Sequence, residues 1–192
     1  MNTELFLDQI SEHMDCFQAL KHRAPEILRA AQELIATIES GQKILICGNG
    51  GSAADAQHFA AELVGRFEKE RSSYPALALT TDSSALTAIG NDYGFERVFS
   101  RQVEGLGRKA DTLIGISTSG NSANILEAVR KAASMGMRTI GLLGRDGGSI
   151  AGEVNFPVIV PHARTARIQE AHSFILHFWA CCVDEAVKEP GS

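Results

Sequence analysis

The chain has 192 residues, of which 44% are hydrophobic and 21% charged, a composition that supports a full hydrophobic core and excludes a globally disordered chain. Its 18 basic and 23 acidic residues give a formal net charge of −5, which argues against nonspecific nucleic-acid binding because such binding depends on neutralising phosphates. The four cysteines, Cys16, Cys47, Cys181 and Cys182, form no C-x-x-C pair. We therefore expect buried free thiols, not a disulfide framework or a structural zinc site.

The start of the chain lacks the basic residues and the sustained apolar stretch of a signal peptide. No window approaches the roughly 18 consecutive apolar residues that a membrane span needs. These features predict a cytoplasmic protein that crosses no membrane.

Two amphipathic helices are predicted at the beginning of the chain. Apolar residues from Phe6 to Leu20 recur at spacings of three and four, which predicts a helix over residues 3–21. Pro25 opens a second helical pattern that ends near Gly41. We expect residues 1–40 to form a helical extension that packs against other subunits.

Short apolar strands then alternate with helices. The strands are expected at residues 43–47, 76–80, 111–116, 138–143 and 154–160. The helices are expected at residues 53–67, 86–89, 96–106, 123–134 and 166–187, with a turn at 90–94. This alternation predicts an α/β domain over residues 41–188, built on a doubly wound, five-stranded parallel sheet, with a disordered tail at 189–192.

Two loops that follow predicted strands have the composition of anion-binding loops. The first is Gly48-Asn-Gly-Gly-Ser52 and the second is Ser117-Thr-Ser-Gly-Asn-Ser122. Glycine allows close backbone approach, hydroxyl groups add donors, and the helix that follows offers free N–H groups and a positive dipole end. In an open parallel sheet both loops lie where ligands bind, at the carboxyl ends of strands.

The first loop also resembles part of a dinucleotide-binding fingerprint. It reads Gly48-x-Gly50-x-x-Ala53, and Asp82 follows the next strand. Such a site would not explain the hydroxyl-rich second loop. A compact sugar phosphate would use both loops.

Two helices carry groups suited to metal binding or acid–base chemistry. His58 and Glu62 are four residues apart and share a helix face. On the last helix, Gln169 and His177 are separated by about 80° and about 12 Å on an ideal helix, and His172 lies about 60° from Gln169 on the other side. Spacing alone leaves the choice between His172 and His177 open.

Several segments resemble the sugar isomerase (SIS) domain family, and in particular members that isomerise heptose phosphates. They are CGNGGSAADAQHFAAELVGRFEKER, ALTTDSSALTAIGNDYGFERVFSRQ, GISTSGNSANIL, GRDGG and ARIQEAH, with His177 following. The resemblance implies a flavodoxin-like SIS fold and conversion of sedoheptulose 7-phosphate to D-glycero-D-manno-heptose 7-phosphate. That reaction is the first step toward the ADP-heptose of the lipopolysaccharide core.

The resemblance also implies roles for individual residues. Substrate contacts would come from Asn49, Gly50, Gly51, Glu62, Asn91, Asp92, Ser117, Thr118, Ser119, Ser122 and Gln169, with the four hydroxyl residues on the phosphate. The zinc ligands would be His58, Glu62, Gln169 and His177, one ion per subunit. The protein would be a homotetramer with its sites at subunit interfaces.

Aldose–ketose isomerisation moves a proton between C1 and C2 through an enediol, so it needs a base, an acid and stabilisation of the enediolate. We expect Glu62 to be the base and His177 the acid, while zinc would polarise the sugar oxygens. Tight zinc ligation would compete with proton transfer by the same two groups. Asp55 and Asp92 are candidate supporting groups, although a carboxylate at Asp55 can simply favour a helix dipole.

Two other functions are compatible with the fold. Similar proteins associate with the bacterial replication initiator without isomerase activity, and others are sugar-phosphate-sensing domains fused to DNA-binding segments. The acidic start lacks a basic recognition helix, which argues against the second alternative. Against the first, a binding protein has no need of Glu62 beside a ligand loop.

Overall fold

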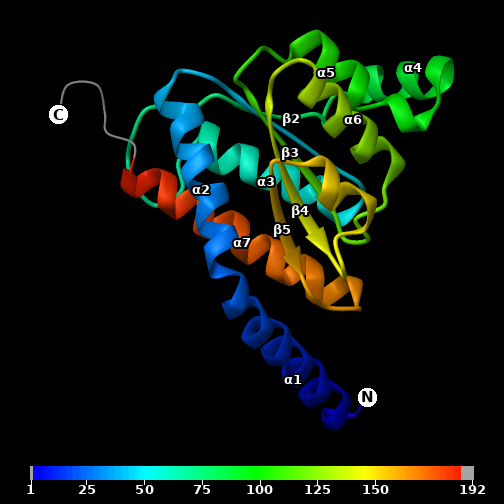
Figure 1. The fold of residues 1–192 in the computed structure, drawn as a ribbon. Helices are drawn as coiled ribbons and strands as arrows, with labels where there is room; N and C mark the ends of the chain where they lie inside the picture. Colours follow the sequence, from blue (N-terminus) through cyan, green and yellow to red (C-terminus); the bar gives the residue numbers. More distant parts are fainter. Residues whose placement is uncertain (1, 187–192) are drawn as a thin grey trace.

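The computed structural model describes residues 2–186 and contains one parallel sheet of five strands (Figure 1). The strands are β1 (Ile44–Gly48), β2 (Ala76–Ala78), β3 (Thr112–Ser117), β4 (Arg138–Gly144) and β5 (Phe156–Val160). Their order is β2-β1-β3-β4-β5, with Ile46 of β1 paired to Ala78 on one side and Ile114 on the other. This flavodoxin-like order confirms the predicted doubly wound α/β fold.

Within residues 2–186, seven α-helices connect and flank these strands. They are α1 (Thr3–Leu20), α2 (Ala24–Glu39), α3 (Gly51–Val64), α4 (Ser83–Tyr93), α5 (Ser100–Leu106), α6 (Ala123–Ser134) and α7 (Thr165–Ala186). Three 3₁₀ turns complete the described chain: η1 (Lys21–Arg23), η2 (Phe95–Arg97) and η3 (Gly148–Glu153). No helix among the described residues combines the length and apolarity needed to cross a bilayer.

Each face of the sheet is covered by its own set of helices. Alternate residues of β1 point to opposite faces, so Ile44 and Ile46 join the core beneath α2, α3 and α7, while Leu45 and Cys47 join the core beneath α5 and α6. Both faces are therefore buried, as the continuous apolar strands predict.

The cysteines are free, as expected, but only two of them are fully buried. Cys16 and Cys47 lie in the core, and burial raises the pKa of the Cys47 thiol. Cys181 and Cys182 are half-buried on α7, so the expectation of burial was wrong for this pair, which lies partly on the outer side of its helix.

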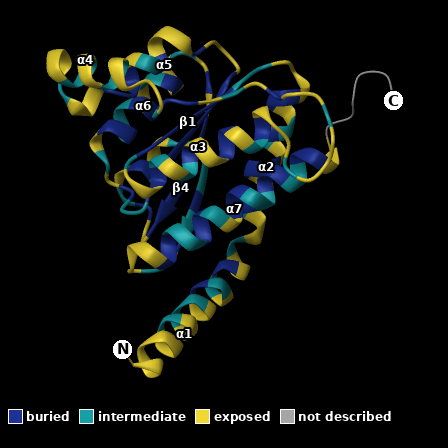
Figure 2. Cartoon of the chain, turned by 180° about the vertical axis from the view of Figure 1, so that it is seen from behind, coloured by how far each residue is buried: buried dark blue, intermediate teal, exposed yellow. Residues whose placement is uncertain are grey.

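Helix α1 projects from the body of the chain, and only its last turns are covered (Figures 1 and 2). Cys16 and Leu20 are buried, whereas the first three turns expose a set of large apolar residues. That set is Leu5, Phe6, Leu7, Ile10 and Met14. The amphipathic helix predicted from spacing is present, but its apolar face has no cover within one chain.

The segment around residues 83–93 differs from the prediction. Helix α4 continues to Tyr93, so the turn predicted at 90–94 was wrong and only Gly94, with a φ of 89°, breaks the helix. Asp82 is the N-cap of α4 and accepts from the backbone N of Ala85 at 2.9 Å. A capping role accounts for Asp82 without a dinucleotide.

Other boundaries shifted by a few residues. Helix α3 ends at Val64, not at 67, because Gly65 follows and the chain turns there. The helix predicted at 96–106 is split into η2 and α5, and η3 was missed within a glycine-rich stretch. The end of the predicted last helix at 187 and the predicted tail at 189–192 lie outside the described residues.

Candidate active site

Helices α3 and α7 lie side by side and run in the same direction, although more than 100 residues separate them in sequence (Figures 1 and 2). The side-chain amide of Gln169 occupies the space that a Cβ at Gly51 would need. Further along, the hydroxyl of Ser173 donates to Oδ1 of Asp55 at 2.8 Å. One turn later, Nε2 of His58 lies 2.7 Å from Nε2 of His177. The two helices therefore contact each other through three successive residue pairs, each farther from the first loop than the one before.

The first loop forms the start of α3. Gly50 has a φ of 56° and is the N-cap residue, a conformation that side chains rarely adopt. At Gly48, an added Cβ would collide with the carbonyl of Ser52, so the loop depends on glycine there. Asn49 and Asn124 exchange two side-chain hydrogen bonds of 2.9 and 2.8 Å. These bonds tie the first loop to α6, which begins just after the second loop.

The second loop brings three hydroxyl groups together. Oγ of Ser117 lies 2.9 Å from Oγ of Ser122 and 3.4 Å from Oγ of Ser119. Gly120 has a φ of 67° and packs so tightly against the backbone at Gly147 that any side chain would clash. Thr118 is half-buried beside them, with its carbonyl oxygen close to Gly144.

Both loops offer positive helix ends to a ligand. They follow the neighbouring strands β1 and β3 and precede α3 and α6, and neither helix has an acidic residue in its first turn. Unpaired N–H groups and helix dipoles at such ends favour an anion. The predicted pair of anion-binding loops is thus assembled at one edge of the sheet.

Three groups with metal-binding and acid–base chemistry converge farther along α3. Donor atoms of His58, Glu62 and His177 all lie within 4.8 Å of one another. Nδ1 of His58 is 3.5 Å from Oε1 of Glu62, and their side chains are 47% and 20% exposed. Two imidazoles and one carboxylate with access to solvent form a donor set that suits a catalytic divalent ion such as zinc.

The fourth predicted ligand, Gln169, does not join this cluster. It lies against Gly51, two helix turns before His177, because one face of α7 cannot bring both to the same point of α3. The structure therefore unites three of the four proposed zinc ligands and places Gln169 beside the first loop, where a substrate-binding amide fits.

His172 has different surroundings from His177. It is fully buried, and its Nε2 donates to the carbonyl of Leu143 at 3.0 Å. Burial lowers the pKa of its imidazole to about 4, with a small opposing effect of that hydrogen bond. His177 lies near His58 and Glu62 instead, so of the two histidines it is the one that stays a candidate for the site.

Asp55 stands between the first loop and the cluster. Burial raises the pKa of its carboxyl group, while the Ser173 hydrogen bond and the nearby imidazoles of His58 and His177 act in the opposite direction. Its Oδ2 is buried and has no hydrogen-bond partner within residues 2–186. Asp55 therefore contacts α7 through Ser173 and lies near enough to the two histidines to feel their charge, so the helix dipole is not its only interaction.

Asn91 and Asp92 lie apart from this arrangement. They occupy the last turn of α4, where both are exposed and Nδ2 of Asn91 donates to Oδ1 of Asp92 at 2.8 Å. Helix α4 contains no buried residue. A substrate contact by these two residues thus stays a prediction, and their exposure leaves them free to face another subunit.

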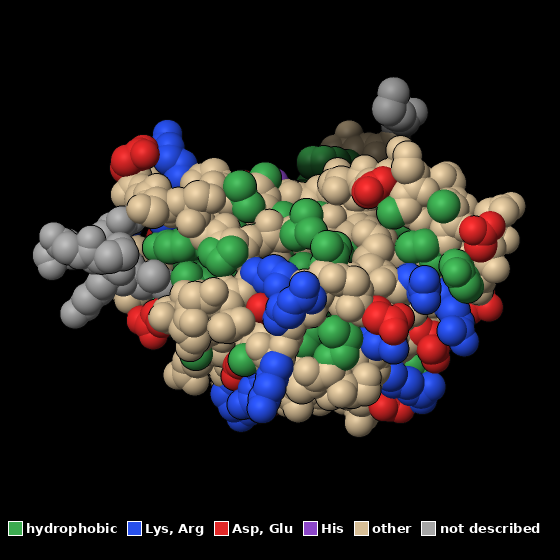
Figure 3. All heavy atoms as spheres, turned by 90° about the horizontal axis from the view of Figure 1, so that it is seen from above, with side chains coloured by type: hydrophobic (Ala, Val, Ile, Leu, Met, Phe, Trp, Pro, Cys, Tyr) green, Lys and Arg blue, Asp and Glu red, His purple; other side chains and the backbone are tan. Residues whose placement is uncertain are grey.

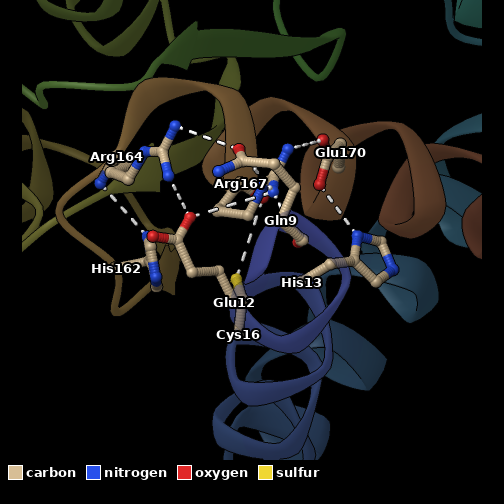
Figure 4. Close-up of polar contacts among 8 residues, drawn as sticks. All are labelled: Gln9, Glu12, His13, Cys16, His162, Arg164, Arg167 and Glu170. Atoms are coloured by element: carbon tan, nitrogen blue, oxygen red, sulfur yellow. Dashed lines mark hydrogen bonds and ion pairs between the residues drawn. The ribbon is translucent and has the colours of Figure 1, made fainter. Parts of the chain in front are cut away.

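A polar network that the sequence reasoning missed anchors the start of α7 to α1 (Figure 4). The buried guanidinium of Arg167 donates to the carbonyl of Gln9 at 2.7 Å and pairs with Glu170. Nδ1 of His13 lies 2.8 Å from Glu170, and these bonds lower the pKa of that carboxyl despite its partial burial. Arg167 and Glu170 flank Gln169 in the ARIQE segment, so the network fixes the turn that presents Gln169.

Ser173 and Phe67 were also missed. Ser173 lies four residues from both Gln169 and His177, a spacing that was available in the sequence. The ring of Phe67 stacks on His177 with centroids 5.6 Å apart and planes at 23°. No local pattern predicts that contact, because Phe67 lies beyond the end of α3.

Comparisons with known proteins identify the family. The family model for the SIS domain matches residues 6–144. Phosphoheptose isomerases from Neisseria gonorrhoeae and Neisseria meningitidis serogroup A are 53% identical over 190 residues and 58% identical over 165 residues. The first alignment covers 95% of this chain and 96% of the relative, and the second covers 84% of each.

Solved structures give the same result. The phosphoheptose isomerase structure from Neisseria gonorrhoeae has a TM-score of 0.91 at 49% identity, covering 96% of this chain and 99% of the other. That from Francisella tularensis has a TM-score of 0.87 at 39% identity, covering 96% and 100%. The chain belongs to the SIS domain family and, within it, groups with the phosphoheptose isomerases.

Proposed function

We propose that this member of the SIS domain family is an aldose–ketose isomerase that converts sedoheptulose 7-phosphate to D-glycero-D-manno-heptose 7-phosphate. The observation that carries the proposal is the convergence of Glu62 and His177 on a helix pair that begins at an anion-binding loop. Relatives at 53% and 58% identity carry the name of this activity. The product would feed synthesis of the ADP-heptose used in the lipopolysaccharide core.

The phosphate of the substrate would be held by the second loop. The hydroxyl of Ser117 already lies within hydrogen-bonding range of those of Ser119 and Ser122, and Thr118 would add a fourth hydroxyl. A doubly charged phosphate would bridge these donors and the start of α6 without any basic side chain. The net charge of −5 is therefore no obstacle to binding this anion.

The sugar would extend along α3 from the first loop. Asn49, Gly50 and Gly51 offer amide and backbone donors there, with Gln169 held against the loop. Glu62 would remove the proton from one carbon of the C1–C2 pair and return it to the other. His177 would donate a proton to the C2 carbonyl oxygen to form the enediol and then take the proton of the C1 hydroxyl as C2 is protonated, so the reaction consumes no further reactant.

Zinc, one ion per subunit, would be held by His58, Glu62 and His177, whose donor atoms fit such an ion. When bound, it supplies Lewis-acid polarisation of the sugar oxygens. Gln169 would become a ligand only by leaving its place at Gly51. Since Glu62 and His177 are also the proton-transfer groups, metal binding and acid–base work share the same side chains.

We also propose that the chain forms a homotetramer through the extension at residues 1–40. Helix α1 exposes the large apolar side chains of Leu5, Phe6, Ile10 and Met14 close together on one helix, and exposed apolar patches often mark interaction sites. An apolar pocket of about 320 Å³ lies at its base. It is lined by Phe17, Leu20, Lys21, Ala24, Ile27, Leu28, Phe174 and Phe178. A second copy would cover both features, and exposed residues such as Asn91 and Asp92 would then reach a neighbour's site.

We expect no nucleic-acid or membrane partner, and the surface charges support this expectation. The cytoplasmic location stays a prediction from the sequence. Figure 3 shows Lys and Arg side chains beside Asp and Glu side chains on the face seen from above. Around α5 and α6, Arg130 pairs with Glu153 at 2.7 Å and Lys131 with Glu104 at 3.7 Å. Basic side chains that are paired in this way neutralise one another's field and offer little to a polyanion.

A replication-initiator-associating protein without isomerase activity is the alternative. Its requirements would be met by the fold and the loops alone. Such a protein would not need a cluster of metal-binding and acid–base groups. This chain has one, in which the half-buried carboxylate of Glu62 lies beside the exposed imidazoles of His58 and His177. The names of the relatives also favour the enzyme.

The test is incubation of the purified protein with sedoheptulose 7-phosphate, following aldose formation with and without a chelator. We expect turnover, with Glu62→Gln lowering kcat by about 10²–10⁴-fold, the usual contribution of a positioned base. Glu70→Gln is the matched control, because the Glu70 side chain is 91% exposed. Within residues 2–186 its ion pair is with Arg66, at 3.6 Å. Full turnover by Glu62→Gln would remove Glu62 as the base, and no turnover by the wild-type protein would overturn the proposed function.

A further inference from the structure

The segment after α3 folds back onto the far end of α7 and is held there by a buried ion pair. Nε of Arg71 donates to Oδ1 of Asp184 at 2.8 Å, and the two side chains are only 4% and 2% exposed. The Arg71 guanidinium also lies 4.1 Å above the ring of Tyr74. We call Arg71 and Asp184 the clamp. It joins the ends of the two helices that carry Glu62 and His177.

The Arg71 half of the clamp caps α3. Its guanidinium donates to the carbonyls of Glu62 at 2.7 Å, Leu63 at 2.9 Å and Gly65 at 3.1 Å. Carbonyls in the last turn of a helix have no partner within the helix, and a cation there also favours the negative end of the helix dipole. The backbone of Glu62 is thereby fixed by a direct hydrogen bond.

The Asp184 half holds the segment over His177. Its Oδ2 accepts from the backbone N of Glu68 at 3.0 Å and of Lys69 at 3.1 Å. Burial acts to raise the pKa of Asp184, but the bonds from Arg71 and these amides outweigh it and lower the pKa. The residue before Glu68 is Phe67, whose ring stacks on His177. Fixing the two amides thus fixes the ring that covers the imidazole.

A buried ion pair is seldom retained for stability alone, because desolvation of both charges offsets most of their attraction. Here Arg71 holds the backbone of Glu62, and Asp184 holds the segment whose Phe67 ring stacks on His177. We propose that Arg71 and Asp184 are positioning residues, which set the placement of Glu62 and His177 through the α3 carbonyls and the Phe67 ring. This inference rests on the proposed function only where kcat is measured, because Co²⁺ binding tests it without any isomerase activity.

The test compares Asp184→Asn with Asp111→Asn. Asp111 is an equally buried carboxylate that accepts from two backbone amides, those of Lys43 and Arg108, and pairs with the Lys43 ammonium at the other end of the sheet strands. Both variants lose one buried charge, so both are expected to lose stability. Co²⁺ is the probe metal, because its visible absorption reports the geometry of its ligands.

For Asp184→Asn we expect about 10–100-fold weaker Co²⁺ binding, the usual effect of removing groups that orient ligands, with an altered visible spectrum. Its kcat should fall more than its KM changes. Asp111→Asn should keep the Co²⁺ affinity, the spectrum and kcat of the wild type at temperatures where both variants are folded. A folded Asp184→Asn with wild-type Co²⁺ affinity, spectrum and kcat would overturn the proposal.

A second variant covers the case in which Asp184→Asn does not fold. Phe67→Leu leaves the clamp intact but removes the ring from His177, and Phe67 is only half-buried. We expect the same loss of Co²⁺ affinity and change of spectrum, in smaller measure. An unchanged Co²⁺ affinity and spectrum in Phe67→Leu would overturn the proposal. If the wild type binds Co²⁺ but lacks isomerase activity, the proposed function fails. The Co²⁺ affinity and spectrum of the variants still decide whether the clamp positions Glu62 and His177.

Discussion

Replacing Gly51 by alanine should separate stability from function at the first loop. The φ of Gly51 is not in the left-handed region, so the backbone accepts a side chain there. The added Cβ would collide with the side-chain amide of Gln169, the far end of a flexible side chain that can rotate away. The substitution therefore expels Gln169 from its place while leaving the rest of the loop intact.

The two effects have opposite signs and different sizes. Alanine in place of glycine in a helix stabilises the fold by up to about 1 kcal/mol, and rotating away the amide end of the half-buried Gln169 side chain costs little of that. Loss of a Gln169 hydrogen bond to the substrate should cost about 1–3 kcal/mol of transition-state binding, or about 5–150-fold in kcat/KM. We expect an unchanged or higher Tm together with that loss of activity.

The matched control is Gly105→Ala on α5, where an added Cβ meets no atom within 4 Å. It should raise the Tm by a similar amount and leave kcat/KM unchanged. The assay is sedoheptulose 7-phosphate turnover beside thermal unfolding. A Gly51→Ala protein with normal Tm and normal kcat/KM would refute the role given to Gln169, and a large drop in Tm would refute the view that only a side-chain end must move.

Three further outcomes follow from the structure. His177→Ala should cost far more activity per folded molecule than His172→Ala, and equal effects would contradict the assignment of His177 to the site. Because the folded pKa of His172 is about 4, below its ordinary 6.5, the native state binds fewer protons, so stability should fall as the pH drops from about 6.5 toward 4, by up to about 3 kcal/mol. Urea unfolding of wild type and His172→Gln across this range checks that sign, and parallel pH profiles would contradict it. Replacing Phe6 and Ile10 by serine should shift the assembly toward smaller species in analytical ultracentrifugation without lowering the helix content, whereas an unchanged tetramer would exclude this face of α1 as its contact.

Much of the site was readable from local patterns. The strands and the two loops could be predicted because apolar runs, glycines and hydroxyl residues act over a few neighbouring positions. His58 and Glu62 could be paired because residues four apart share a helix face. The doubly wound parallel sheet followed from the βα alternation and the handedness of parallel crossovers, whereas the order of the five strands came from the structure.

Only the tertiary structure decided which distant residues meet. His58 and His177 are 119 positions apart, and their contact depends on α3 and α7 packing in one register, which no local spacing encodes. The same register places Gln169 at Gly51, leaves His172 in the core, and brings Arg71, which lies beyond the end of α3, to Asp184 in the last turn of α7. The sequence by itself determined the fold and the chemistry of the loops, since both arise from short-range preferences. Tertiary packing decided which of the candidate residues meet, namely His58, Glu62 and His177 without Gln169, because their cluster is an interface between two helices.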